Sequence, residues 1–368
     1  MSVTPRTDTG ATEATGAAVR PHRSAPIPVT RAGKAPGRAR RRAVTVAIGA
    51  MVVAAALSVF IGTRWIEPGQ VWDVLVNGRD GGGDIGIIIW DQRIPRTLLA
   101  IAVGAALALS GALVQGVTGN PLGDPGVLGI SSGAAFGSVL AVFLLGVQTV
   151  TGYVWFAVLG AIVAALIVFG IASMGGGGAS PLSLVLAGAA LSAFFVAGTT
   201  AVILNDQASL NQYRFWNAGS LVERDLSILA GVAPLMVIGA IVALACGPAL
   251  NALAAGADVA TALGVRIGLV RTACFLALTM LAATGTAAAG PLAFIGLLVP
   301  HIMRHFTGPD HRWLLPACIP AGAALVLVAD VIGRVVMRPD EVQVGVILAF
   351  IGVPFFVALV RRRQMVKL

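Results

Sequence analysis

The histidine-rich stretch near residue 300 is the first place where side chains could carry out chemistry. His301 and His305 stand four residues apart, and Asp310 and His311 follow. Residues four apart share one face of a helix, and His and Asp are common zinc ligands. The stretch lacks the glutamate of the H-E-x-x-H motif, and the charge of Arg304 would repel a metal ion. We therefore interpret it as an interfacial cytoplasmic loop and predict neither a metal site nor catalytic residues.

Acidic side chains within apolar segments are the second place, because charge inside a membrane is costly and marks ion-coupled transport. The stretch 125–205 contains no charged residue. Asp330 is the best intramembrane acid, and Arg334 follows at the spacing that lets two side chains pair on one helical face. This pattern predicts a structural or docking ion pair rather than a proton relay.

Phosphate chemistry depends on lysine, and the chain has only Lys34 and Lys367, both close to its ends. A phosphate-binding loop of the G-x-x-x-x-G-K-[ST] type is therefore excluded. The glycine-rich segment 175–178 lacks a lysine and is interpreted as a connector. By itself the chain cannot bind ATP in this manner, and we predict no cofactor.

The amino-acid composition shows whether these residues lie in a water-soluble protein or in a membrane protein. Of 368 residues, 57% are hydrophobic and 11% charged, with a mean hydropathy of +0.90. A soluble domain carries about 25% charged residues. These values predict an all-α integral membrane protein. The cysteines have no paired spacing and predict neither a disulfide framework nor a zinc site; they are Cys246, Cys274 and Cys318.

Positive charge is concentrated in the two tails. Residues 1–42 carry a net charge of +7 and the last eight residues +4, whereas 43–360 carry −2. Such tails are typical of the cytoplasmic, anionic-lipid side of a membrane, so the charge does not indicate a nucleic-acid partner. We predict a disordered basic arm over 1–42, a transmembrane domain over 43–362 and a cytoplasmic tail over 363–368.

Charge-free intervals long enough to cross a bilayer predict about ten transmembrane helices, because a crossing needs about 20 apolar residues. An even number places both termini on one side. With the termini inside, 17 Lys and Arg residues lie inside and 8 outside, which favours cytoplasmic termini. The intervals are 43–63, 97–123, three within 125–205, 226–257, two within 272–304, 313–336 and 342–360.

A glycine ladder indicates close helix packing. Gly129, Gly133 and Gly137 form two overlapping GxxxG pairs. A helix face without side chains lets a neighbouring helix approach closely in a membrane. With 46 glycines in the chain, chance occurrence stays an alternative.

Several segments together resemble the permease family of ABC importers for ferric siderophores, haem and cobalamin. They occur in the family's order and cover about 43–362. The segments are 93–96 (RIPR), 104–134, 186–188 (LAG), 215–221 (FWNAGSL), 290–336 and 341–356 (EVQVGVILAFIGVPFF).

This resemblance implies a type II importer permease fold in the cell membrane. It also implies two permease subunits around a central path, two cytoplasmic ATPase subunits and an extracytoplasmic binding protein that delivers the chelate. The second permease subunit is an identical or a homologous chain. The fifth and tenth spans are those that the resemblance assigns to the path.

The resemblance also implies roles for individual residues. Arg93 and Arg334 match the arginines that receive acidic side chains of the binding protein, whereas Arg96 is interpreted as snorkelling to the membrane boundary. The segment 251–266 matches the coupling helices that sit in a cleft of the ATPase. It departs from the family pattern at Ala257 and Asp258, where two acids are common, and Gln343 stands where proline is usual. Its candidate coupling residues are Leu253, Gly256, Asp258, Leu263 and Gly264.

Three functional classes stay open. The first is an ABC import permease that carries a ferric siderophore, with cobalamin or haem as alternative cargo. The second is an ion-coupled secondary transporter, which would need no ATPase. The third is a membrane enzyme centred on the histidine-rich stretch 301–312.

Overall fold

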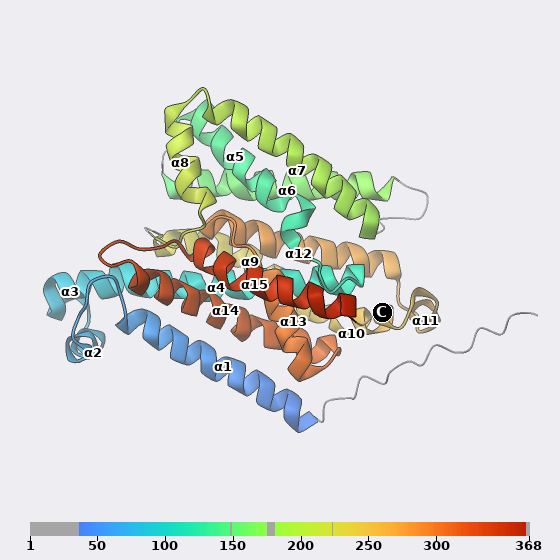
Figure 1. Ribbon diagram of the computed structural model, residues 1–368, viewed down its shortest axis with the longest axis horizontal. Coiled ribbons are helices and arrows are strands. Elements are labelled where there is room, and N and C mark those ends of the chain that lie inside the picture. Colours follow the sequence, from blue (N-terminus) through green and yellow to red (C-terminus); the bar gives the residue numbers. More distant parts are fainter. Residues whose placement is uncertain (1–36, 148, 175–180, 223, 366–368) are drawn as a thin grey trace, which may run out of the picture. The chain divides into compact units, whose positions relative to one another are not determined.

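The computed structural model describes residues 37–147, 149–174, 181–222 and 224–365, and its regular elements there are all helical (Figure 1). Three short 3₁₀ or π segments lie at Arg79–Gly82, Ile88–Arg93 and Pro125–Leu128. The α-helices are α1 (Gly37–Phe60), α2 (Pro68–Asn77), α3 (Gly83–Ile87), α4 (Ile94–Thr118), α5 (Ile130–Leu145), α6 (Val150–Ser173), α7 (Pro181–Ile203), α8 (Gln207–Asn217), α9 (Leu226–Ala245), α10 (Gly247–Ala254), α11 (Ala257–Ala262), α12 (Ile267–Ala289), α13 (Ile295–Thr307), α14 (His311–Val336) and α15 (Val344–Met365).

Seven of these helical segments are long and apolar enough to cross a membrane, which confirms the all-α membrane fold. Two shorter apolar helices, Ile130–Leu145 and Val344–Leu359, accompany them. The helix α13 covers 13 residues and corresponds to the shorter span expected within 272–304. Counted together these helices match the ten expected crossings, but the number that crosses and the side of the termini stay predictions.

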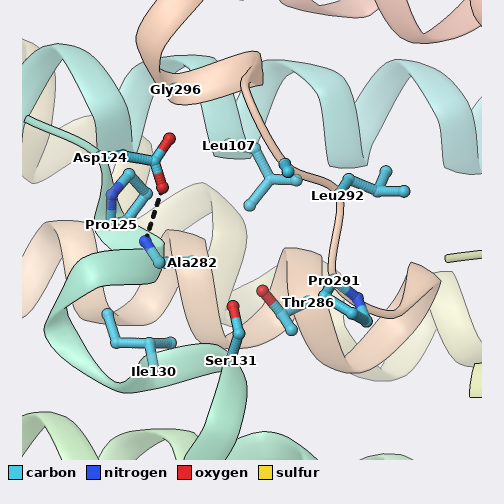
Figure 2. Close-up of a pocket in the computed structure, with 12 residues that line it drawn as sticks. Leu107, Asp124, Pro125, Ile130, Ser131, Ala282, Thr286, Pro291, Leu292 and Gly296 are labelled. Carbon is cyan, nitrogen blue, oxygen red and sulfur yellow. Dashed lines mark hydrogen bonds between the residues drawn. The ribbon is translucent and has the colours of Figure 1, made fainter. Parts of the chain in front are cut away.

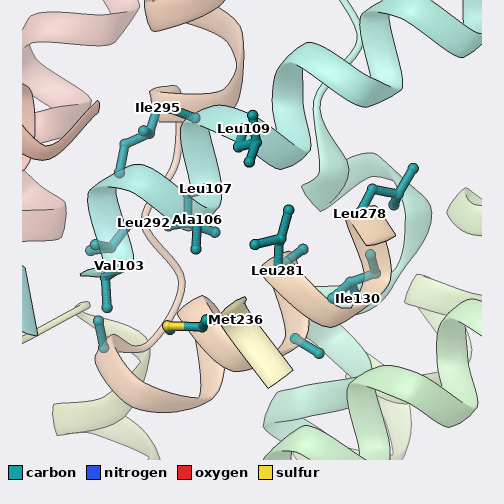
Figure 3. Packing of buried hydrophobic residues seen from close by; sticks show 14 of the residues in the cluster. Val103, Ala106, Leu107, Leu109, Ile130, Met236, Leu278, Leu281, Leu292 and Ile295 are labelled. Atoms are coloured by element: carbon teal, nitrogen blue, oxygen red, sulfur yellow. The ribbon is translucent and has the colours of Figure 1, made fainter. Parts of the chain in front are cut away.

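The helix α4 lies at the centre of the packing, and α1 lies at its edge. The continuous helical stretch Gly83–Thr118 contains α4, and 78% of the residues in its most apolar part are buried. In the most apolar part of α1 only 17% of the residues are buried. A helix that is hydrophobic all round and buried belongs to a core, whereas an exposed apolar helix faces lipid. Figure 3 shows Leu107 and Leu109 of α4 in one cluster with Leu281 of α12 and Met236 of α9.

Glycine pairs let α4 contact its neighbours backbone to backbone. Gly104 faces Gly322 of α14, and Gly111 faces Gly296 of α13. An added Cβ atom at Gly104, Gly111 or Gly322 would overlap the opposite helix, and one at Gly296 would overlap Pro125. Such contacts replace the side-chain interdigitation of soluble cores. The sequence contains no GxxxG pair that identifies these two contacts.

A non-helical segment, 290–294, lies between α12 and α13 and is partly buried. The N–H of Ser220, just after α8, donates to the carbonyl of Ala289 at 2.8 Å, and the N–H of Gly345 donates to Gly219 at 3.0 Å. Backbone that leaves the helix at membrane depth needs such internal partners. These bonds tie the end of α12 and the start of α15 to the turn that follows α8.

The structure changes two domain boundaries. Residues 37–42 belong to helix α1 rather than to a disordered arm, because alanine and arginine favour helix and Arg40 pairs with Asp310 across the chain. At the other end α15 continues to Met365, past the expected boundary at 362. The remainder of the basic arm, the connector 175–178 and residues 366–368 lie outside the described residues.

The interpretation of the histidine-rich stretch as a loop was wrong. His301 and His305 lie within α13, and His311 is the first residue of α14. The His301 ring meets the ring of Phe355 edge-on, with centroids 5.6 Å apart. Across the described ranges, no group of three or more His, Cys, Asp and Glu side chains is close enough to hold a metal ion.

Candidate functional site

An ion network joins the start of α4 to the end of α14. The Nη2 atom of Arg96 donates to Oδ1 of Asp330 at 2.6 Å, and its Nη1 atom donates to Oε2 of Glu341 at 2.9 Å. Asp330 is only 1% exposed and also pairs with Arg334, four residues later on α14. The Asp330–Arg334 pair is therefore confirmed. The interpretation of Arg96 as a snorkelling side chain was wrong, because two carboxylates hold its guanidinium group.

Arg334 also caps the end of α1 with its two terminal nitrogen atoms. Its Nη1 atom donates to the carbonyl of Ser58 at 2.8 Å, and its Nη2 atom donates to the Ser58 hydroxyl at 3.1 Å. Carbonyl groups in the last turn of a helix have no partner within the helix, so a cation is stabilised there. The side chain of Arg334 thus links α14 to α1.

Arg93 caps the same helix end from a different direction. Its Nη1 atom donates to the carbonyls of Val59 and Phe60 at 2.8 and 2.9 Å, and its Nη2 atom donates to the carbonyl of Arg64 at 2.9 Å. Among the described residues it has no acidic partner within ion-pair distance. The sequence gives no sign of this arrangement, because the acceptors are backbone atoms about 30 residues away.

The two predicted docking arginines are therefore not presented at the surface of this structure. Arg93 is 4% exposed and Arg334 is 2% exposed. Their guanidinium groups act within the chain, and exposed basic side chains surround this end of the bundle instead, among them Arg64, Arg79 and Arg338. Whether Arg93 and Arg334 contribute to docking stays a prediction.

The predicted coupling segment forms two short helices, α10 and α11. Gly256 separates them with φ of 113°, and Gly264 follows α11 with φ of 78°, both in the region that favours glycine. The buried side chains of Leu250 and Ala260 attach the two helices to the bundle.

The exposed side of the predicted coupling segment carries three of the candidate residues. Leu263 is 69% exposed, and Asp258 is exposed in the first turn of α11, while Leu253 is half-buried. The segment therefore presents a mainly apolar surface with one exposed acid, Asp258, and one exposed base, Arg266.

A polar cluster, which we call the inner clamp, fixes this segment to α1 and α14. Asn251 of α10 donates from Nδ2 to Oδ1 of Asp310 at 2.6 Å and accepts from the backbone N–H of His311 at 2.8 Å. Arg40 of α1 pairs with Oδ2 of Asp310 at 3.2 Å. The members of the inner clamp are Arg40, Asn251, Asp310 and His311.

The charge state of Asp310 follows from these contacts. Partial burial raises the pKa of its carboxyl group, but several contacts together outweigh this effect and hold the pKa below its usual range. They are the hydrogen bonds from Asn251 and from the backbone of Arg312, and the positive charges of Arg40 and Arg312. The inner clamp therefore contains an ionised carboxylate at neutral pH.

The glycine ladder has two members rather than three. Gly133 and Gly137 of α5 face Gly160 of α6 so closely that an added Cβ atom would overlap α6. Gly129 was assigned wrongly to this contact. It precedes α5 with φ of 76°, and its nearest neighbours belong to Ser192 and Gly188 of α7.

Two cavities lie beside the 290–294 segment. The first, of about 240 Å³, lies between α4, α12 and the start of α5 and is shown in Figure 2. Its polar wall consists of Asp124, Ser131 and Thr286. Asp124 accepts a hydrogen bond from the N–H of Gly126 at 2.8 Å, while burial raises the pKa of its carboxyl group. The second, of about 630 Å³, is an apolar hollow along α15 that includes Phe350.

The model of the FecCD transport family matches residues 50–362 of the sequence. The chain belongs to this family. Its FecCD match covers all the helices described above except the first turns of α1 and the last residues of α15.

Curated relatives agree with this assignment. The chain is 44% identical to the ferric enterobactin transport system permease protein FepD of Escherichia coli (strain K12), over 85% of this chain and 93% of that protein. It is 36% identical to the hemin transport system permease protein HmuU of Yersinia pestis, over 75% and 84% of the two chains. It is also 36% identical to the cobalamin import system permease protein BtuC of Halobacterium salinarum, over 76% and 74%.

A solved structure supports the fold. A metal-chelate type ABC transporter in an inward-facing conformation has a TM-score of 0.74 to this FecCD-family chain, with 29% identity, covering 88% of this chain and 99% of that one. The chain is thus a multi-pass inner-membrane permease subunit of an ABC importer. ATP hydrolysis lies in partner subunits, and the family implies ATPase and binding-protein partners.

Proposed function

We propose that this FecCD-family permease translocates a ferric siderophore delivered by a binding protein. The supporting observation is the 44% identity to a ferric enterobactin permease along almost its whole length. A second relative, a siderophore transport system permease protein of Bacillus subtilis (strain 168), is 39% identical over 82% of this chain. Haem or cobalamin is the second candidate cargo, favoured by the 36% identities to the hemin and cobalamin permeases.

The proposed transporter contains two permease subunits and two cytoplasmic ATPase subunits, with both permease termini in the cytoplasm. The second permease, identical or homologous, covers the hollow along α15. Phe350 is 75% exposed there in the single subunit. A large apolar surface of this kind needs either lipid or another chain as cover. By resemblance to the family, α7 and α15 line the path between the subunits.

Energy enters through the coupling segment. Leu253, Leu263 and the turn at Gly256 seat the segment in the ATPase, and Gly264 and Asp258 complete its surface. When the ATPase subunits close on ATP, movement of α10 passes through Asn251 and Asp310 to α14. The helix α14 packs along α4 through glycine, so the shift is transmitted to the core and opens the path to one side at a time.

Docking of the binding protein takes place at the outer end of α1, α4 and α14. Arg93 and Arg334 hold the end of α1 in position there, and binding-protein acids that reach them must replace internal partners. Exposed Arg64 and Arg338 are the first cations that an approaching acidic surface meets. Such rim charges act mainly on association, so docking depends on salt.

Reconstitution tests the proposal. The permease, its ATPase, and liposomes loaded with ATP should take up a radioactive ferric siderophore when the binding protein is added. Omission of the ATPase should abolish uptake. Accumulation by the permease alone, driven by an ion gradient, would overturn the proposal in favour of a secondary transporter. Chemical turnover that is lost on replacing His301 and His305 would favour the enzyme alternative.

A further inference from the structure

A groove runs along the outside of the bundle where α1 meets α13 and α14. Its volume is about 710 Å³, and its walls are apolar except at one end. The helix α1 forms one wall and runs along the edge of the bundle beside α14 in Figure 1. Because few of its residues are buried, this helix faces the membrane. The residues that matter here are Arg38, Arg42, Val46 and Ala50 on α1, and Met303 and Phe306 on α13.

One stripe of α1 carries both the charge and the apolar surface. Arg38, Arg42, Val46 and Ala50 follow one another at four-residue intervals, so they lie on one helical face. At 1.5 Å per residue, Ala50 lies about 12 Å along the axis from Arg42. The stripe thus changes from cationic to apolar along the length of the groove.

The two arginines of this stripe lack partners in the described part of the chain. Neither Arg38 nor Arg42 makes a hydrogen bond or ion pair there, and both are exposed. Arg40, on another face of α1, is bound to Asp310 in the inner clamp. No acidic side chain is among the described residues that line the groove. Two uncompensated cations therefore lie at the end of an apolar channel.

We propose that this groove binds an anionic glycerophospholipid. An acyl chain lies against Val46, Ala50 and Met303, and the headgroup phosphate accepts hydrogen bonds from Arg38 and Arg42. Clusters of arginine at a membrane surface attract anionic lipid, and the apolar wall requires a ligand with a hydrocarbon chain, which free phosphate lacks. The lipid belongs to the leaflet at the start of α1. It fills the gap between α1 and the pair α13 and α14 and so stabilises their packing.

The test measures lipid retention by the full-length permease with native mass spectrometry. The probes are phosphatidylglycerol and phosphatidylcholine of equal chain length. The wild-type protein should retain more phosphatidylglycerol than phosphatidylcholine. Arg38→Ala with Arg42→Ala should lower this preference about tenfold, because each arginine near the headgroup contributes attraction. The matched control is Arg41→Ala with Arg312→Ala, which removes two exposed charges that do not line the groove and should leave the preference unchanged.

A second variant tests the apolar half. Ala50→Phe fills the groove without changing charge and should lower retention of both lipids; the exposed position of Ala50 makes the substitution compatible with folding. The proposal would be overturned if the Arg38 and Arg42 double variant and the Arg41 and Arg312 double variant lost the preference for phosphatidylglycerol equally. General surface charge would then explain lipid binding. Unchanged retention in Ala50→Phe would overturn it as well. A protein–protein complex that dissociates in these variants would show a second chain in the groove and not a lipid.

Discussion

Arg96 and Asp330 are 234 positions apart in the chain, yet they form a two-pronged ion pair where the start of α4 meets the end of α14. Asp330 lies between Arg96 and Arg334, and neither arginine has another fully buried acid beside it. The pair fixes the position of the start of α4 relative to the end of α14. The end of α1 is attached to the same network through Arg334.

Removing the central carboxylate should destabilise the subunit strongly. In Asp330→Ala, two guanidinium groups stay buried without their main acid, which costs about 3–5 kcal/mol. Thermal unfolding of the purified permease should show a clear drop. Glu341→Gln is the control, because Glu341 is partly exposed at the rim, and its loss should cost about 1 kcal/mol or less. Equal effects of the two substitutions would contradict the central role of Asp330.

Charge reversal should separate docking from folding. Arg93→Glu with Arg334→Glu places acids against backbone carbonyls and beside Asp330, so we expect loss of both yield and uptake. Arg64→Glu with Arg338→Glu alters exposed residues and should lower uptake while thermal stability stays near that of the wild-type protein. Uptake assays at two salt concentrations should show the effect weakening as salt rises. Full uptake by the Arg64 and Arg338 variant would exclude these residues from docking.

The coupling surface can be tested with two equally exposed leucines. Leu263→Asp should weaken binding of the ATPase about tenfold, because it puts a charge into an apolar contact. Leu269→Asp is the matched control, since Leu269 is 67% exposed but lies outside the coupling segment. Co-purification with the ATPase and binding-protein-stimulated ATP hydrolysis are the measurements. The coupling assignment fails when both variants behave alike.

The glycine contact between α5 and α6 should be sensitive to side-chain size. Gly133→Leu must push α5 away from Gly160 and Ala164, and we expect a loss of about 1–3 kcal/mol or more. Gly170→Leu in α6 is the control, because an added Cβ atom there meets no neighbour within 4 Å. Thermal unfolding of both variants in the same detergent provides the comparison. A stable Gly133→Leu protein would contradict the packing role.

The inner clamp should depend on acid pH. The pKa of Asp310 is lowered in the folded protein, so its carboxylate contributes stability above its unfolded-state pKa of about 3.9. This contribution is lost as the pH falls through the still lower folded value. The thermal stability of the wild-type protein should therefore exceed that of Asp310→Asn at pH 7, and the difference should shrink below about pH 3.9. A difference that does not change with pH would mean that the ionised form is not what stabilises the clamp.

Local sequence determined most of the membrane architecture. Hydropathy identified each long apolar helix, because a crossing must satisfy its backbone hydrogen bonds within one continuous segment. The same local logic predicted the Asp330–Arg334 pair, since its two members lie one helical turn apart. The motifs around RIPR and the 251–266 segment are enough by themselves to indicate an importer permease of this family.

Tertiary structure decided which of these residues are accessible and which helices touch. Arg93 and Arg334 turn inward because the unpaired carbonyls at the end of α1 come within reach only after α1, α4 and α14 pack together. The contacts of Gly104 with Gly322 and of Gly111 with Gly296 likewise depend on the crossing points of separate helices. Hydropathy and spacing describe one segment at a time. A contact between segments instead depends on the free energy of the whole packed bundle, which no single stretch of sequence contains.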